Sequence, residues 1–208
     1  SEGKYNFVHW ATIPPPVKMM AETLQTLGYK RVAILSQKHS SINAQTAEFV
    51  KTAPAYGLTI LCDEKLNPDE KDARTTILRI KELKPDIVLL NCLNPVGEIV
   101  LRQMNELNYT PSISAITCLY ALKRDVLKDI WWVDPSIARP EFYAKYEAKF
   151  KAPLEVGASN HYDSVGLLAY AYEQWEGQGL PDADFVAEKL MAVRDYVGAM
   201  GPANPTPE

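Results

Sequence analysis

The sequence predicts an α/β fold, a Rossmann-like lobe in which a parallel sheet lies between two layers of helices. Segments with helical periodicity alternate with short apolar runs that show no polar alternation, which is typical of parallel strands covered on both faces. The apolar runs begin at residues 32, 58, 86 and 112 and are therefore 26, 28 and 26 residues apart. This interval fits right-handed βαβ units, so we expect consecutive strands to be joined by helices.

The first helix is expected to begin near Val17, because Pro16 suits a first helical turn and Gly28 suits the residue after the last one. The run "RVAIL" then predicts a buried strand over 31–35. The following elements alternate in the same way, with helices expected over 42–56 (its end disturbed by Pro54), 73–84 and 96–107, and strands over 58–62, 86–90 and 112–117.

The alternation of strands and helices ends after residue 120. A short helix over 121–127 and a short strand over 130–133 precede three helical segments without intervening strands, over 140–150, 161–175 and 182–194. The middle segment is apolar around most of its circumference, so we expect it to need cover on several sides. Asn160 is predicted to be its N-cap, with Asp163 in the capping-box position. The tail from 198 is rich in Gly and Pro and is not expected to be helical.

Charge and hydropathy limit the possible functions. The formal net charge of −4 argues against nucleic acid and against a polybasic membrane anchor. No apolar run approaches the ~20 residues of a membrane span, and the first residues carry no signal-peptide pattern, so direct membrane insertion is not expected. The three cysteines lack metal-ligand spacing and are expected to be buried, and no cofactor or metal is expected.

The order of these elements resembles that of the type I periplasmic binding proteins, specifically the branched-chain amino acid receptor family of ABC transporters. Four segments carry the resemblance: 5–41, beginning "YNFVHWATIPPP"; 65–109, which includes "KELKPDIVLLNCLNP"; 141–174, which includes "SNHYDSVGLLAYAYEQ"; and 185–208, which ends "VGAMGPANPTPE". They cover most of the chain in the family's order, although each alone is a fold pattern with little specificity.

The resemblance implies three parts. Residues 5–135 would form ligand-binding lobe two, 136–154 a crossover helix and linker, and 155–208 a part of lobe one, so the rest of lobe one would lie outside this chain. It further implies a periplasmic or extracytoplasmic receptor, not an enzyme, with two partners: a small organic solute held between the lobes and the membrane permease that receives it.

Candidate ligand-binding residues follow from the rule that parallel sheets bind ligands beyond the carboxyl ends of their strands. Two come from the polar loop after the first strand, and the others are carried over from the family's ligand-facing loops and crossover. They are Ser40, Ser41, Leu93, Asn94, Cys118, Tyr120, Trp10 and Thr12. Helix capping is an equally good interpretation of Ser40, Ser41 and Asn94.

The ligand class can also be narrowed through the resemblance. Amino-acid receptors of the family commonly place an acidic side chain near the positions of Cys118–Tyr120, where it pairs with the ligand's ammonium. The stretch from Thr117 to Tyr120 has no acid. We therefore expect an apolar or aromatic carboxylate rather than an α-amino acid. The charged stretch "CDEKLNPDEKD" over 62–72 is expected to be solvated surface.

Other functions remain open at this point. An α/β enzyme would need a positioned nucleophile or acid–base pair, but His9, His39 and His161 are scattered and no nucleophile-elbow or zinc motif occurs. A flavodoxin- or receiver-like domain would need a phosphate loop or an acidic cluster at strand ends. A regulatory ligand-sensing domain of the same fold fits the same sequence features as a transport receptor.

Overall fold

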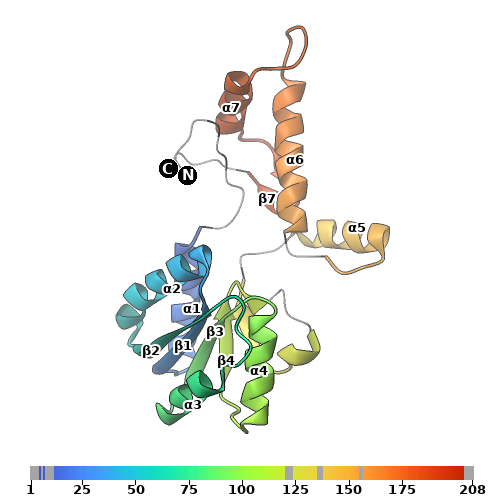
Figure 1. The fold of residues 1–208 in the computed structure, drawn as a ribbon. Coiled ribbons are helices and arrows are strands. Elements are labelled where there is room, and N and C mark those ends of the chain that lie inside the picture. The colour runs from blue at the N-terminus through green and yellow to red at the C-terminus, as the bar shows by residue number, and fades with distance from the viewer. Residues whose placement is uncertain are drawn as a thin grey trace. The chain divides into compact units, whose positions relative to one another are not determined.

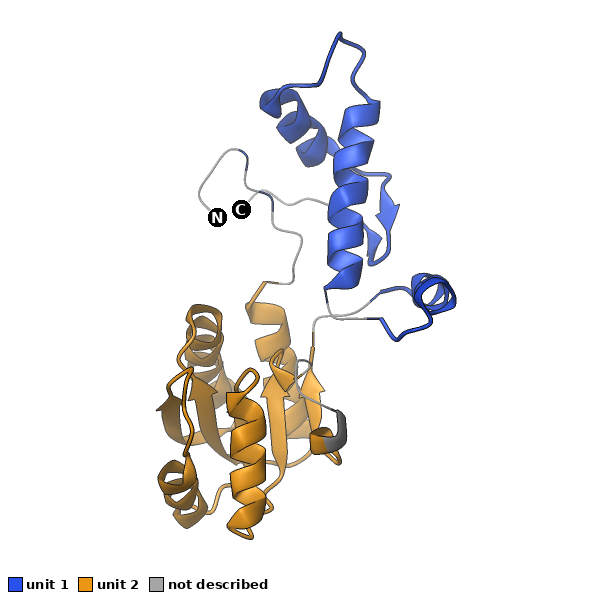
Figure 2. Cartoon of the chain, turned by 45° about the vertical axis from the view of Figure 1, so that its right-hand side comes forward, with its two compact units in different colours: residues 1–10, 136–208 blue, residues 11–135 orange. Residues whose placement is uncertain are grey.

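The computed structural model describes Tyr5, Phe7 and residues 12–119, 124–134, 138–154 and 157–203. The chain divides into two compact units, 11–135 and 1–10 with 136–208 (Figure 2). The unit that contains the sheet therefore begins at residue 11, whereas the resemblance implied a lobe that begins at residue 5. Tyr5 Oη donates a 2.6 Å hydrogen bond to Asp184 Oδ1, which ties Tyr5 to the C-terminal part of the chain. The assignment of the units to lobes stays a prediction.

Unit 11–135 contains a five-stranded sheet in which every neighbouring pair is parallel (Figure 1). Its order is β2-β1-β3-β4-β5. The strands are β1 (Arg31–Gln37), β2 (Thr59–Leu66), β3 (Ile87–Asn91), β4 (Ile113–Ile116) and β5 (Trp131–Val133). The predicted parallel-sheet fold is therefore confirmed.

Helices cover both faces of this sheet. They are α1 (Pro14–Thr26), α2 (Ser40–Thr52), α3 (Arg74–Glu82) and α4 (Val96–Glu106), with 3-10 turns over Ala53–Tyr56 and Arg124–Leu127. Val32 and Ile34 of β1 pack with α1 and with Phe49 of α2, whereas Ala33 and Leu35 pack with α3 and α4. Successive strand residues point to opposite faces, so the apolar runs supply two cores and the lobe has three layers.

Strand β2 is longer than predicted. It continues through Asp63, Glu64 and Lys65 to Leu66, a stretch expected to be solvated surface. Because β2 lies at the sheet edge, its charged side chains reach solvent or helix side chains while its backbone still pairs with β1. The expectation of a loop was wrong because charge does not exclude an edge strand.

The predicted helix caps were also wrong in part. Helix α2 begins at Ser40 after an extended His39, and α4 begins after Pro95, and neither has a side-chain capping hydrogen bond. Ser40 and Ser41 therefore lie inside the first turn of α2. The predicted disturbance by Pro54 is confirmed, since α2 ends at Thr52 and continues as a 3-10 turn.

The other unit contains α5 (Pro140–Phe150), α6 (Ala158–Glu173), α7 (Ala183–Ala192) and a small antiparallel ribbon of β6 (Val197–Gly198) and β7 (Gly201–Pro202). Helix α6 starts after Gly157, before the predicted N-cap Asn160. Asp163 does not cap the helix. It is 1% exposed and accepts hydrogen bonds from the backbone N–H groups of Ala199 (2.5 Å) and Met200 (2.9 Å).

Helix α6 carries apolar side chains that this unit does not cover, as expected from the sequence. Val165 is 68% exposed and Leu168 46%, with Tyr162 and Tyr172 also exposed on the same helix. Spacings of three and four residues place these four side chains on one helical stripe.

Candidate ligand site at the carboxyl edge of the sheet

The candidate site lies where β1 and β3 end. The chain leaves β1 toward β2 on one side and later returns to β3 on the other, so the order β2-β1-β3 makes this a topological switch point. In open α/β sheets the crevice beyond such a point is the usual place for a ligand. The loops 38–39 and 92–95 border it, and the loop after β4 lies beside the second.

Buried side-chain amides hold these loops together. Gln37 Oε1 accepts a 2.9 Å hydrogen bond from the backbone N–H of Leu93 and so joins the ends of β1 and β3. Asn91 Oδ1 accepts from the N–H of Ile116 at 3.0 Å, and Gln45 Nε2 donates to Thr117 Oγ1 at 2.7 Å. The loop positions at this edge are therefore fixed by three side chains that the sequence analysis did not single out.

The same network leaves three buried polar atoms without a partner among the described residues. They are Asn91 Nδ2, Gln45 Oε1 and Thr46 Oγ1. A buried polar group without a hydrogen bond costs about 1–3 kcal/mol. The end of β3 at Asn91 and the adjoining turn of α2 at Gln45 and Thr46 thus contain more unpaired polar atoms than is typical of protein cores.

The predicted residues of the first two loops lie at the surface. Ser40, Ser41 and Asn94 are exposed, and Leu93 is half-buried. Ser41 Oγ lies 2.9 Å from His39 Nδ1, so these two side chains form a local polar pair at the start of α2. A polar rim beside one partly exposed leucine suits a small ligand with an apolar body.

The other predicted residues divide into three groups. Thr12 is exposed two residues before α1 begins. Cys118 is 2% exposed and belongs to the core, so its thiol offers almost no surface to a ligand. Trp10 and Tyr120 lie outside the described residues.

An acidic side chain next to the third loop escaped the sequence analysis. Asp134 follows β5, and β5 pairs with β4 through Val133 and Ile116. The Thr117 N–H donates to the Val133 carbonyl at 2.7 Å, which places Asp134 beside the Thr117–Leu119 loop. Burial raises the Asp134 pKa, and the hydrogen bond from Trp132 lowers it by a smaller amount. The loop itself has no acid, but a neighbouring strand supplies one.

The two buried cysteines are unsuited to catalysis, and of the described histidines only His39 lies beside a side-chain hydroxyl, that of Ser41. Burial raises the pKa of Cys118 to about 12 and also raises that of Cys92, so both are protonated at neutral pH. The predicted burial holds for these two cysteines, while Cys62 is half-buried. His161 Nδ1 lies 2.6 Å from the carbonyl oxygen of Gly157, the residue that precedes α6. His9 lies outside the described residues.

A parallel sheet with polar loops fixed at a switch point is the arrangement found in many α/β ligand-binding lobes. The chain belongs to the periplasmic binding protein family, whose pattern matches residues 2–207. The predicted resemblance is therefore confirmed, and the family is non-enzymatic. None of the helices in the described part of the chain combines the length and the hydropathy needed to cross a membrane.

The curated Leu/Ile/Val-binding protein BraC3 of Rhizobium johnstonii is 26% identical over 181 residues, which cover 83% of this chain and 49% of BraC3. This chain thus spans about half the length of that relative. A solute-binding protein of Rhodopseudomonas palustris, solved in complex with benzoate, has a TM-score of 0.81 at 16% identity, covering 96% of this chain and 58% of that one. A leucine-binding protein of Thermotoga maritima has a TM-score of 0.74 at 18% identity, covering 91% and 57%.

Proposed function

We propose that this chain is part of an extracytoplasmic receptor that captures a small organic solute and delivers it to the permease of an ABC transporter. The observation that carries the proposal is the switch point between β1 and β3, where buried amides fix the loops of a chain that matches the periplasmic binding protein family over 2–207. Holding a ligand in this way calls for no nucleophile and no acid–base pair.

In this function no covalent bond is made or broken. The ligand contacts both lobes and binds the closed arrangement more tightly than the open one, so it shifts the hinge equilibrium toward closure. The closed form then docks on the permease. Because one lobe supplies only part of the contacts, we expect the 208-residue chain alone to bind the solute weakly.

The first ligand class is an apolar or aromatic carboxylate. Leu93 would contact the apolar body, while Asn94, Ser40 and Ser41 would donate to the carboxylate. Cys118 would contribute through its main chain only, because its thiol is buried. Thr12, Trp10 and Tyr120 complete the proposed set. The benzoate bound by the Rhodopseudomonas palustris relative supports this class.

The second ligand class is an apolar α-amino acid, and one specific observation favours it. Asp134 places a carboxyl group beside the Thr117–Leu119 loop, where the sequence had suggested that no acid was available. Its carboxylate could pair with an ammonium group. The Leu/Ile/Val-binding relative supports this class.

A thermal-shift screen of the full-length gene product against both classes tests the proposal. At least one apolar carboxylate or amino acid should raise the melting temperature, because a ligand that binds only the native state stabilises it. Leu93→Asp should abolish the shift, and Asn105→Ala on the exposed surface of α4 should leave it unchanged. If no compound of either class shifted the transition, the receptor proposal would be wrong.

A further inference from the structure

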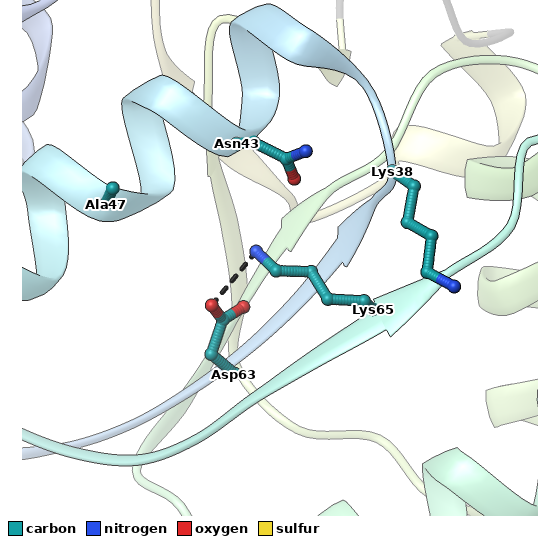
Figure 3. A pocket seen from close by; sticks show the side chains of 5 residues that line it. All are labelled: Lys38, Asn43, Ala47, Asp63 and Lys65. Atoms are coloured by element: carbon teal, nitrogen blue, oxygen red, sulfur yellow. Dashed lines mark ion pairs between the residues drawn. The ribbon is translucent and has the colours of Figure 1, made fainter.

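A hollow of about 480 Å³ lies between α2 and the edge strand β2, beside the candidate ligand site. Lys38, Asn43, Ala47, Asp63 and Lys65 line it (Figure 3). On α2, Asn43 and Ala47 lie on the helical face opposite Gln45, which bonds the loop after β4. The lining shares none of the candidate ligand residues, although Lys38 belongs to a loop that borders the candidate site.

The floor of the hollow is a closed polar cluster. Lys65 Nζ donates to Ser36 Oγ at 3.0 Å and pairs with Asp63 Oδ2 at 2.9 Å. Ser36 Oγ donates in turn to Asp63 Oδ1 at 3.2 Å, and Ser36 itself is fully buried. This cluster holds the Lys65 ammonium in one place beneath α2. The Lys65 side chain is 30% exposed, whereas that of Lys51, on α2, is 79% exposed.

Several N–H donors of the side chains that line the hollow have no acceptor among the described residues. An ammonium has three N–H donors, of which Lys65 uses two. Lys38, at the rim, directs one of its three donors to Asn67 Oδ1 at 2.9 Å. The Asn43 amide has no hydrogen-bond partner among the described residues, and in Figure 3 it extends from α2 toward Lys65. Two lysines and one aspartate leave the lining with one net positive charge.

We propose that this hollow binds a compact oxyanion, a carboxylate or phosphate group, between Lys65 and Asn43 with Lys38 at the rim. A lysine held by two hydrogen bonds loses little side-chain freedom when it binds, which favours it over a free surface lysine. Ala47 makes room for the anion, because a longer side chain at this position would occupy the hollow. The proposal does not depend on the solute-receptor function, because none of the lining residues was assigned to the solute and all of them belong to one unit, 11–135, so this site needs no second lobe.

The test is an NMR titration of the 208-residue chain with inorganic phosphate and, separately, with acetate, at constant ionic strength. Saturable shifts should appear at the Lys65 side-chain NH₃⁺ and at the Asn43 amide with at least one probe, and the stronger probe identifies the source of the oxyanion. Lys38→Met should weaken binding by about tenfold, the effect of one hydrogen bond to a charged group. Lys51→Met removes the same charge from an exposed position of α2 and should change nothing.

Two further variants keep the proposal falsifiable if a lysine substitution impairs folding. Ala47→Leu leaves every charge in place and should abolish binding by filling the hollow. Asp63→Asn removes the only negative charge of the lining and should strengthen binding. Shifts that grow linearly without saturation, or that survive Ala47→Leu, would overturn the proposal. So would equal losses in Lys38→Met and Lys51→Met, which would indicate only a diffuse effect of charge.

Discussion

Gln45 Nε2 donates a 2.7 Å hydrogen bond to Thr117 Oγ1, and this bond joins α2 to the loop after β4 across 72 residues of sequence. Thr117 has a φ of +53°, a backbone conformation that β-branched residues rarely adopt. The hydrogen bond and the loop conformation therefore occur at the same residue, next to the candidate ligand site.

Two substitutions of Thr117 should separate these effects. Thr117→Asn should raise the free energy of unfolding by about 1 kcal/mol, because asparagine tolerates positive φ and its Oδ1 can still accept from Gln45. Thr117→Val keeps the strain, removes the acceptor and should lower the free energy of unfolding by about 1–2 kcal/mol. Urea denaturation measures both. Equal stability of the wild type and the Val variant would show that the Gln45 bond contributes nothing.

Asp163 should stabilise the ribbon of β6 and β7. Its carboxylate accepts from two backbone N–H groups, whereas an asparagine would place an NH₂ group against one of these donors. We expect Asp163→Asn to cost about 2 kcal/mol in this unit. Hydrogen exchange at the Ala199 and Met200 amides should accelerate accordingly, while the exposed control Glu173→Gln on the same helix should not change it. Unchanged protection in Asp163→Asn would contradict this role.

Asp134 should make stability depend on pH. Because burial raises its pKa in the folded state, the folded state holds the proton more tightly than the unfolded state does. This carboxyl group's contribution to stability is therefore greatest below its unfolded pKa of about 3.9, and it falls as pH rises through the raised folded pKa. Asp134→Asn, which keeps the oxygen that accepts from Trp132, should be slightly more stable than wild type at pH 7. The difference should vanish below about pH 3.

Denaturation of both proteins across this pH range provides the measurement. A loss of stability in Asp134→Asn at pH 7 would show that the ionised carboxylate has a stabilising partner. If Asp134→Asn is instead more stable than the wild type at pH 7, the Asp134 carboxyl group reduces stability. Such a cost would fit a role in binding, since functional sites often reduce stability.

The thiols should react in the order of their burial. Cys62 is half-buried, whereas Cys92 and Cys118 are in the core. Because burial raises all three pKa values, reaction with a thiol reagent at pH 7 should be slow throughout, with Cys62 labelled first. Mass spectrometry of the labelled chain checks the order. Early labelling of Cys118 would mean that the loop after β4 opens in solution.

The sequence predicted the strands and helices of unit 11–135 because each is an apolar run or a helical period that stands out locally. It missed relationships between segments. The capping prediction for Asp163 was wrong because its true partners, Ala199 and Met200, lie more than 30 residues away. Asp134 was overlooked because only the pairing of β4 with β5 brings it to the site.

The candidate site follows the same pattern. The strand-end rule led to Ser40 and Ser41, and the family resemblance to Leu93 and Asn94, and all four have exposed or partly exposed side chains. The resemblance also led to Cys118, whose thiol is buried, because a position in the sequence does not show whether a loop side chain points to the core or to solvent. The amides that fix the loops could not be recognised, since isolated glutamines and asparagines carry no spacing signal.

Calorimetric titration of the full-length gene product with leucine and with benzoate tests the central claim most directly. The receptor proposal predicts saturable 1:1 binding of at least one of these compounds or of a close analogue, and Leu93→Asp should abolish it. Preference for leucine would favour the α-amino acid class, and in that case Asp134→Asn should weaken binding by about tenfold or more, the loss of one buried charged contact. An absence of saturable heat for both compounds and for the apolar carboxylates and amino acids related to them would contradict the claim.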